Sequence, residues 1–209
     1  VETFPFTIAD NTALAGSVYD NNTLDFIDGV TFDAVNNVIT VPAGVSSFTL
    51  TVESTEDTNE EPSEFYDLTV GGVAATGTIT DDDTVIVADV TSDTQLEGDD
   101  LQHTITLSGT STNVETFPFT IADNTALAAS DYDNTTLVFS DGVTYDAVNN
   151  EITVPAGVLD FTVTVESTED TNEEPSEFYD IAVGGVAATG TITDDDTVIV
   201  ADVTSDTQL

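Results

Sequence analysis

The chain contains a long internal repeat that leaves few folds open to it. Residues 1–96 recur as residues 114–209, a period of 113 residues, and the two copies differ at 12 of 96 positions. Repeats of this kind indicate tandem copies of one structural unit. Any fold for this chain must therefore suit both copies of nearly the same sequence.

The differences between the copies show which positions face water. Four of these differences bear on the strand pattern: Asp25 and Val138, Ile27 and Ser140, Val38 and Glu151, and Thr69 and Ala182. Their neighbours are apolar in both copies, and in the first copy they are Leu24, Phe26, Ile39, Leu68 and Val70. Because successive side chains of a β-strand point to opposite faces, we expect these neighbours to face a core and the exchanged positions to face water.

Each period contains about seven short strand-like runs separated by turn sequences. Val, Ile, Thr and Phe dominate the runs, and Asp141-Gly142 and Gly184-Gly185 are typical turns. In the complete copy we expect strands at residues 85–90, 102–108, 115–122, 136–139, 151–154, 161–166 together with 178–183, and 187–193. The sequence therefore predicts an all-β protein of tandem antiparallel, Ig-like β-sandwich repeats with Greek-key connections.

The repeat divides the chain into three parts. Residues 1–83 are expected to form a β-sandwich repeat that lacks its first two strands, residues 84–196 a complete repeat, and residues 197–209 the first strand of a following repeat. Two interpretations are open. Either the chain is a window of a longer tandem array, or its last strand pairs with the open sandwich of another copy in head-to-tail association.

The charge of the chain restricts its partners. It has 41 Asp and Glu, no Lys or Arg and one His, so its formal net charge is −41, while 39% hydrophobic residues allow it to bury a core. Self-repulsion opposes compaction, and bound cations would offset it. Since no basic patch can form, we expect no binding of nucleic acid and no direct contact with a membrane.

Carboxylates are concentrated in two segments of the second copy. Residues 166–178 form an acidic loop between two expected strands, and Asp194, Asp195 and Asp196 directly follow a third. Crowded carboxylates repel one another unless a cation lies among them, and Ca²⁺ suits such a site because it takes roughly six to eight oxygen ligands in irregular geometry. We therefore expect Ca²⁺ as the cofactor. The alternative is a solvated acidic surface, as in halophilic proteins, without ordered ions.

An ordered set of motifs resembles the Calx-beta domain. The set consists of Glu97-Gly98-Asp99 with the strand 101–109, Ser130-Asp131-Tyr132, Val154-Pro155-Ala156-Gly157, and the segments 173–178 and 190–196. The resemblance covers essentially the whole chain, as one complete unit and two partial ones. Near-identical copies that are rich in Thr and Asp also resemble the extender regions of giant type I-secreted bacterial surface adhesins.

The Calx-beta resemblance implies a Ca²⁺ site at one end of the sandwich. In the second copy the implied ligands are Glu97, Asp131, Glu169, Asp170, Glu173, Asp194, Asp195 and Asp196. In the first copy they are Glu56, Asp57, Glu60, Asp81, Asp82 and Asp83. Val18 stands where the second copy has Asp131, so we expect the first copy to bind fewer or weaker ions.

No catalytic constellation is evident, and we expect no enzyme. His103 is the single His, lies within an expected strand, and is more typical of a surface or core position than of a catalyst. Paired carboxylates alone would suit a glycosidase. The aromatic residues, however, alternate as core positions and do not cluster as in a sugar-binding cleft.

These features favour a structural extender of a calcium-stabilised extracellular adhesin or cell-surface fibre. Its partners would be neighbouring repeats of the same chain, with head-to-tail self-association as a further possibility. Three alternatives stay open: a strand-exchanging filament subunit, a calcium-sensing regulatory module, and a ligand-binding adhesive domain.

Overall fold

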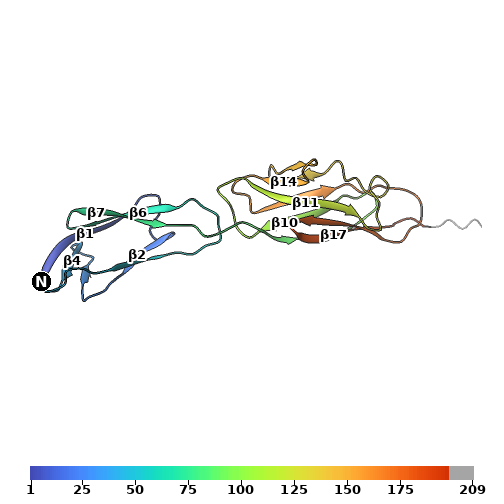
Figure 1. Ribbon diagram of the computed structural model, residues 1–209. Coiled ribbons are helices and arrows are strands. Elements are labelled where there is room, and N and C mark those ends of the chain that lie inside the picture. The colour runs from blue at the N-terminus through green and yellow to red at the C-terminus, as the bar shows by residue number, and fades with distance from the viewer. Residues whose placement is uncertain (198–209) are drawn as a thin grey trace, which may run out of the picture. The chain divides into compact units, whose positions relative to one another are not determined.

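The chain folds into two β-sheet units. The computed structural model describes residues 1–197, and contacts divide the chain into unit 1, Val1–Thr84, and unit 2, Val85–Leu209 (Figure 1). The sequence placed the boundary one residue earlier, and its expected strand at 197–209 lies, apart from Thr197, outside the described residues. Within residues 1–197 the structure contains no helix long and apolar enough to cross a membrane.

Unit 2 is a sandwich of two sheets. One sheet has the strand order β12-β15-β10-β8, and the other has the order β13-β14-β11-β16-β17-β9. The strands are β8 (Val87–Val90), β9 (Asp93–Leu96), β10 (Leu101–Leu107), β11 (Glu115–Asp123), β12 (Val138–Phe139), β13 (Thr144–Asp146), β14 (Glu151–Val154), β15 (Asp160–Val165), β16 (Glu177–Val183) and β17 (Val186–Thr193).

Two strands and one pairing differ from the sequence prediction. β9 and β13 were not expected, because a three- or four-residue strand rich in Asp and Thr shows no apolar alternation. β9 also pairs in parallel with β17, so the sandwich is not wholly antiparallel. All other pairings in unit 2 are antiparallel among the residues described.

The core of unit 2 lies between its two sheets. Leu101 and Ile105 of β10, Phe119 of β11, Val163 of β15 and Ile181 of β16 belong to one buried cluster. The expected alternation is confirmed at its clearest positions: Val138 is 59% exposed, whereas Ile152 next to exposed Glu151 is fully buried. Ser140 and Ala182 are half-buried, so they are less exposed than expected.

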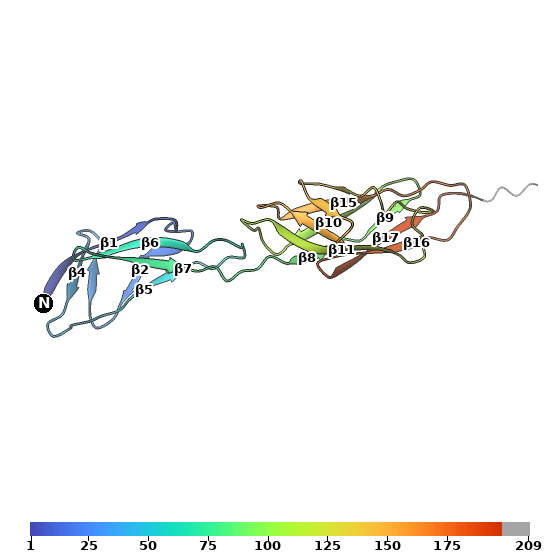
Figure 2. The same ribbon diagram turned by 45° about the horizontal axis from the view of Figure 1, so that its top comes forward.

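Unit 1 has the same framework with fewer strands. Its sheets have the orders β2-β5 and β3-β4-β1-β6-β7, which correspond to β12-β15 and β13-β14-β11-β16-β17 (Figure 2). Its strands are β1 (Glu2–Asp10), β2 (Tyr19–Phe26), β3 (Thr31–Asp33), β4 (Val38–Val41), β5 (Leu50–Ser54), β6 (Glu64–Val70) and β7 (Val73–Ile79). Among residues 1–84, unit 1 therefore has no counterpart of β8, β9 or β10. It lacks three strands, whereas the sequence indicated two.

The missing strands leave the core of unit 1 less covered than that of unit 2. Val70 and Leu68 of β6 are half-buried, whereas their counterparts Val183 and Ile181 are buried. The compact part of the unit 1 core is Phe6, Val30, Ile39 and Val41, with Phe4 and Leu68 among the half-buried residues packed on it.

His103 belongs to the core of unit 2 and is fully buried. Its Nδ1 lies 2.7 Å from the carbonyl oxygen of Thr91, and its Nε2 lies 2.9 Å from the hydroxyl of Tyr179. Burial lowers the pKa of His103, so the ring is held in its neutral form. Both ring nitrogens are thus engaged by groups inside unit 2.

Two valines of adjacent strands test the assigned faces. Val163→Ala removes two methyl groups from a fully buried position and should destabilise unit 2 by about 2 kcal/mol. Val138→Ala, on the neighbouring strand but 59% exposed, should cost well under half of that. Denaturant unfolding measures both, and equal losses for the two variants would contradict the assigned faces.

Candidate metal centre

Four segments of unit 2 meet at one end of its sandwich. The Glu97 N–H donates to the carbonyl of Thr193 over 3.1 Å, which joins the end of β9 to the end of β17. The Thr168 N–H donates to the carbonyl of Asp131 over 2.9 Å, and the Ser167 hydroxyl donates to the carbonyl of Asp99 over 2.8 Å. These hydrogen bonds bring together carboxylates from distant parts of the sequence, such as Glu97 and Asp196.

A first group of carboxylates consists of Glu97, Asp194 and Asp196. One oxygen of each lies within 4.8 Å of the others, and all three side chains are half-buried. Glu97 Oε2 and Asp196 Oδ2 are buried and have no hydrogen-bond partner. Buried carboxylate oxygens without donors are costly unless a cation coordinates them, so this group offers three carboxylates to an ion such as Ca²⁺.

The surrounding acids add to the negative charge of this group. Desolvation and the nearby carboxylates of Asp170 and Asp194 raise the pKa of Glu97. Desolvation and the charges of Asp195 and Asp196 likewise raise the pKa of Glu169. Raised carboxyl pKa values show that full ionisation is unfavourable here without a counter-ion.

Gly98 allows Glu169 to approach the end of β9. An added Cβ at Gly98 would lie 2.7 Å from Glu169 Oε2, and its φ of +75° lies in the region that favours glycine. Any larger residue at position 98 would displace the Glu169 carboxylate.

A second group consists of Asp131, Glu174 and Glu177, again half-buried and with oxygens within 4.8 Å of one another. Desolvation and a side-chain hydrogen bond with Asp131 raise the pKa of Glu177 to about 7. Glu177 therefore binds a proton near neutral pH. A divalent cation could replace that proton and bind both carboxylates.

An aromatic pair positions this second group. Tyr132 follows Asp131 and Tyr179 lies two residues beyond Glu177, and the two rings stack with centroids 4.6 Å apart. The Tyr132 hydroxyl donates to Asp123 Oδ1 over 2.7 Å, and the Tyr179 hydroxyl contacts His103. Both rings are fully buried, so the carboxylates beside them are held on a rigid base.

The loop that carries Asp131 has the same backbone in unit 1. The Asp131 N–H bonds to the Leu127 carbonyl over 2.9 Å, and the Val18 N–H bonds to the Leu14 carbonyl over the same distance. In unit 2 the Asp131 carboxylate also accepts the Leu127 N–H over 2.6 Å. Val18 thus occupies the place of Asp131 without an oxygen to offer.

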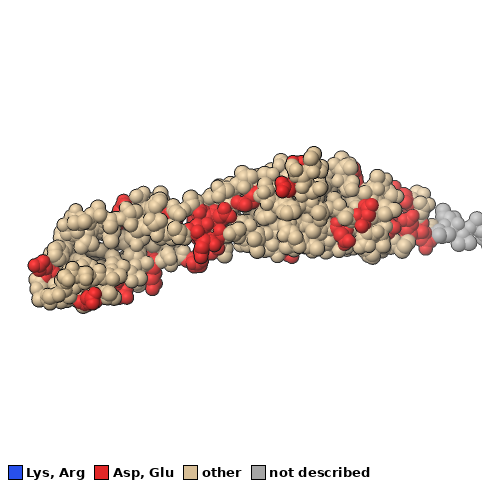
Figure 3. Space-filling model, in the orientation of Figure 1, with Lys and Arg blue, Asp and Glu red and all other residues tan. Residues whose placement is uncertain are grey.

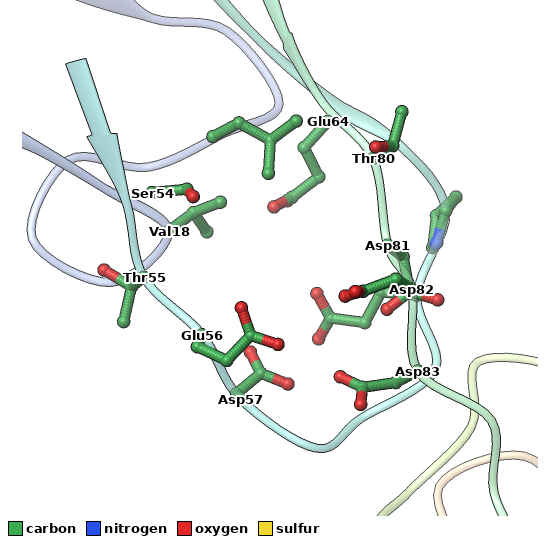
Figure 4. A pocket seen from close by; sticks show the side chains of 13 residues that line it. Val18, Ser54, Thr55, Glu56, Asp57, Glu64, Thr80, Asp81, Asp82 and Asp83 are labelled. Carbon is green, nitrogen blue, oxygen red and sulfur yellow. The ribbon is translucent and has the colours of Figure 1, made fainter. Parts of the chain in front are cut away.

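The acids of unit 1 surround a pocket of about 70 Å³. In Figure 4 the side chains of Glu56, Asp57 and Asp83 point into this pocket, and Val18 lies near Glu64 at its edge. Burial and the charges of Asp81 and Asp82 raise the pKa of Asp83. Within residues 1–197, both groups of three carboxylates that could hold an ion lie in unit 2.

The implied ligands are thus brought together in part. Glu97, Asp131, Asp194 and Asp196 belong to the two groups in unit 2, whereas Glu169, Asp170, Glu173 and Asp195 do not. In unit 1 the pocket is lined by Glu56, Asp57, Asp81, Asp82 and Asp83, but not by Glu60. The sequence analysis did not single out Glu174 and Glu177, or Glu61 and Glu64, which line the unit 1 pocket.

A signal for Glu177 was present in the strand pattern. Glu177 lies on the same face of β16 as Tyr179, Ile181 and Val183, which are all buried, whereas Phe178 on the opposite face is 37% exposed. A carboxylate on the inward face at the start of a strand needs a partner, which distinguishes Glu177 from the exposed acids of the loop. The acidic side chains are also unevenly distributed: on the face drawn in Figure 3 they gather in dense groups with uncharged surface between them.

Comparisons with known proteins found similar solved structures at low sequence identity. Two solved structures are similar to this chain: a crystal structure of CBD12 from CALX1.2 (16% identity, TM-score 0.36) and one of the calcium binding domain CBD12 of CALX1.1 (18% identity, TM-score 0.34). Each match covers 86% of this chain and 66% of the other, so this chain spans just under two thirds of their length. No family model matches the sequence, and no curated protein matches it.

The pKa of Glu177 predicts a pH dependence for the calcium-free protein. Its folded pKa of about 7 lies above the ordinary value of 4.5, so the folded state binds the extra proton and stability falls as the pH rises between these values. Glu177→Gln should flatten this fall, and Glu151→Gln on the exposed surface should not. Thermal unfolding in chelator from pH 4.5 to 7.5 measures it, and parallel profiles for all three proteins would contradict the assignment.

Exchanging Val18 and Asp131 should exchange calcium affinity between the units. A carboxylate about 4 Å from a unit charge contributes ~4 kcal/mol near a protein surface before desolvation, so Asp131→Val should weaken one ion in unit 2 at least tenfold. Val18→Asp should strengthen binding in unit 1. Asp131→Asn, which keeps an oxygen for the Leu127 N–H, separates the loss of charge from the loss of the loop contact. Calorimetric Ca²⁺ titrations unchanged by all three substitutions would exclude Asp131 as a ligand.

Proposed function

We propose that this chain is a structural extender of an extracellular adhesin or cell-surface fibre, in which Ca²⁺ stabilises each β-sandwich. The observation that supports this most directly is the position of the acidic exit segments. Asp81, Asp82 and Asp83 line the acidic pocket of unit 1 and directly precede Thr84, the last residue of that unit. An ion bound there would hold the fold of one unit and also order the start of the connection to the next.

The two units have the properties of a spacer. They repeat one framework with 12 differences in 96 positions, which provides length and no new chemistry. His103, the single histidine, is buried and makes hydrogen-bond contacts through both ring nitrogens, so no histidine is left for catalysis. The formal net charge of −41 makes neighbouring chains repel one another, as suits a surface exposed outside the cell.

A sensing module and a ligand-binding adhesive domain are less well supported. A pocket of about 580 Å³ in unit 1 is lined by Phe4 and Phe48, which would suit an apolar ligand. In unit 2, however, the counterparts Phe117 and Phe161 are buried in the core. The pocket is thus the uncovered core of a sandwich. For a sensor, a second nearly identical copy adds no regulatory function.

The proposal predicts that Ca²⁺ stabilises and stiffens the chain. Each bound ion should add about 2.7 kcal/mol to the free energy of unfolding at a hundredfold excess over its dissociation constant. Melting curves in Ca²⁺, in Mg²⁺ at equal ionic strength and in chelator measure the stabilisation. Small-angle scattering of dilute protein should show a narrower distribution of dimensions with Ca²⁺. A calcium-dependent melting temperature without any change in scattering would contradict the extender and leave only a stabilised domain.

A further inference from the structure

A row of buried side chains connects the core of unit 2 to the second group of carboxylates. His103 on β10 contacts Tyr179 on β16, and the Tyr179 ring stacks on Tyr132, which directly follows Asp131. We infer that His103 is a positioning residue for this group, because it fixes the tyrosine pair beside which Asp131 and Glu177 are held for a cation. This role rests on the proposed binding of Ca²⁺, and it assigns control of one ion to a residue of the core.

The surroundings of His103 determine which of its ring nitrogens carries the proton. Nδ1 lies 2.7 Å from the carbonyl oxygen of Thr91, which can only accept a hydrogen bond, so Nδ1 is the donor of the neutral ring. Nε2 is then the acceptor, and the Tyr179 hydroxyl donates to it over 2.9 Å. Asp93 on β9 is the charged side chain that acts on the ring, and Val163 lies opposite His103 on β15. His103 and Tyr179 are both fully buried, so solvent does not compete for their hydrogen bond.

Gly190 makes room for the Tyr179 ring but does not fix its hydroxyl. The two residues are paired across β16 and β17, and an added Cβ at Gly190 would overlap the ring. Unit 1 repeats this arrangement with Tyr66 and Gly77. The glycine therefore lets the ring lie across β17. A buried hydroxyl also needs a directional partner, and His103 supplies it.

The stacked pair transmits this constraint toward the carboxylates. The centroids of Tyr132 and Tyr179 lie 4.6 Å apart with an interplanar angle of 23°, so in a close-packed core one ring cannot shift without the other. The Tyr132 hydroxyl donates to Asp123 Oδ1 over 2.7 Å. The pair is thus fixed at one end by Asp123 and at the other by His103.

Loss of the His103 acceptor should therefore disturb the second group. Glu177 forms a hydrogen bond with Asp131 and begins the strand that carries Tyr179. With an apolar residue at position 103, the Tyr179 hydroxyl would be buried without this acceptor, and the ring would have to move to find another. Since residues that orient metal ligands control affinity, this movement should weaken the ion bound by Asp131 and Glu177.

Calorimetric Ca²⁺ titration of the full 209-residue chain tests the inference. His103→Leu removes the acceptor and should weaken one ion on the order of tenfold. Tyr179→Phe removes the donor and should weaken it similarly, and the double variant should lose no more than either single variant. His103→Gln keeps an acceptor oxygen and should bind nearly as the wild type does. Unchanged binding in His103→Leu, or equal losses in His103→Leu and His103→Gln, would overturn the inference.

Asp131→Asn as a background separates positioning from a general loss of stability. In this background His103→Leu should have little further effect on Ca²⁺ binding, because the group through which it acts is already impaired. Equal weakening with and without Asp131→Asn would mean that His103 supports the fold alone, and would overturn the inference. A wild type that binds no Ca²⁺ would overturn the calcium-stabilised extender together with it.

The single histidine provides a second readout that does not depend on how well its variants fold. Because His103 gives the only imidazole signals of the chain, its NMR resonances can be followed directly. In chelator, the ring nitrogen shifts should show a proton on Nδ1 and an acceptor at Nε2. Saturating Ca²⁺ should shift these signals in the wild type and much less in Asp131→Asn, since coupling between two sites is reciprocal. If calorimetry shows binding but these signals do not respond, the inference is overturned and the proposed calcium binding stands.

Discussion

Repulsion among carboxylates without any internal cation is the constraint on which this structure depends. With 41 acidic residues and no Lys or Arg, no carboxylate can be neutralised by a basic side chain. Exposed carboxylates are screened by water and salt. At the end of unit 2, however, Glu97 and Asp196 each have a buried oxygen without a hydrogen-bond donor. An external cation would satisfy these oxygens and offset the repulsion around them.

The sandwich brings these acids together because its strand ends converge. β16, β17 and β9 are neighbours in one sheet, and β16 runs opposite to the other two. The residues after β9, after β17 and before β16 therefore lie at the same end of that sheet. The stacked Tyr132 and Tyr179 rings support the second group from below, and unit 1 repeats this pair with Tyr19 and Tyr66 at 4.8 Å. The tyrosine pair is therefore common to both units, whereas the ligand sets differ: Val18 replaces Asp131, and residues 1–84 contain no counterpart of Glu97.

The fold and part of the site follow from the sequence. Alternation within strands and the turns between them depend on local residue patterns, so the β-sandwich and most strands of unit 2 were predictable. β13 and β9 were not, because β13 is held by its pairing with β14 and β9 by its parallel pairing with β17. In the site, Asp194, Asp195 and Asp196 were predictable because they are consecutive in the sequence. Glu174 and Glu177 belong to the site only because the sheet places β16 beside the loop of Asp131, a contact between distant segments.

Anomalous diffraction from crystals grown in Ca²⁺ tests the central claim most directly, since it locates calcium ions without reference to any assumed ligand. The account predicts a calcium peak bounded by Glu97, Asp194 and Asp196, and a second beside Asp131 and Glu177. It also predicts fewer or weaker calcium peaks in unit 1, where Val18 replaces Asp131. Saturating Ca²⁺ with no peak at the end of unit 2, or equal peaks in both units, would contradict it.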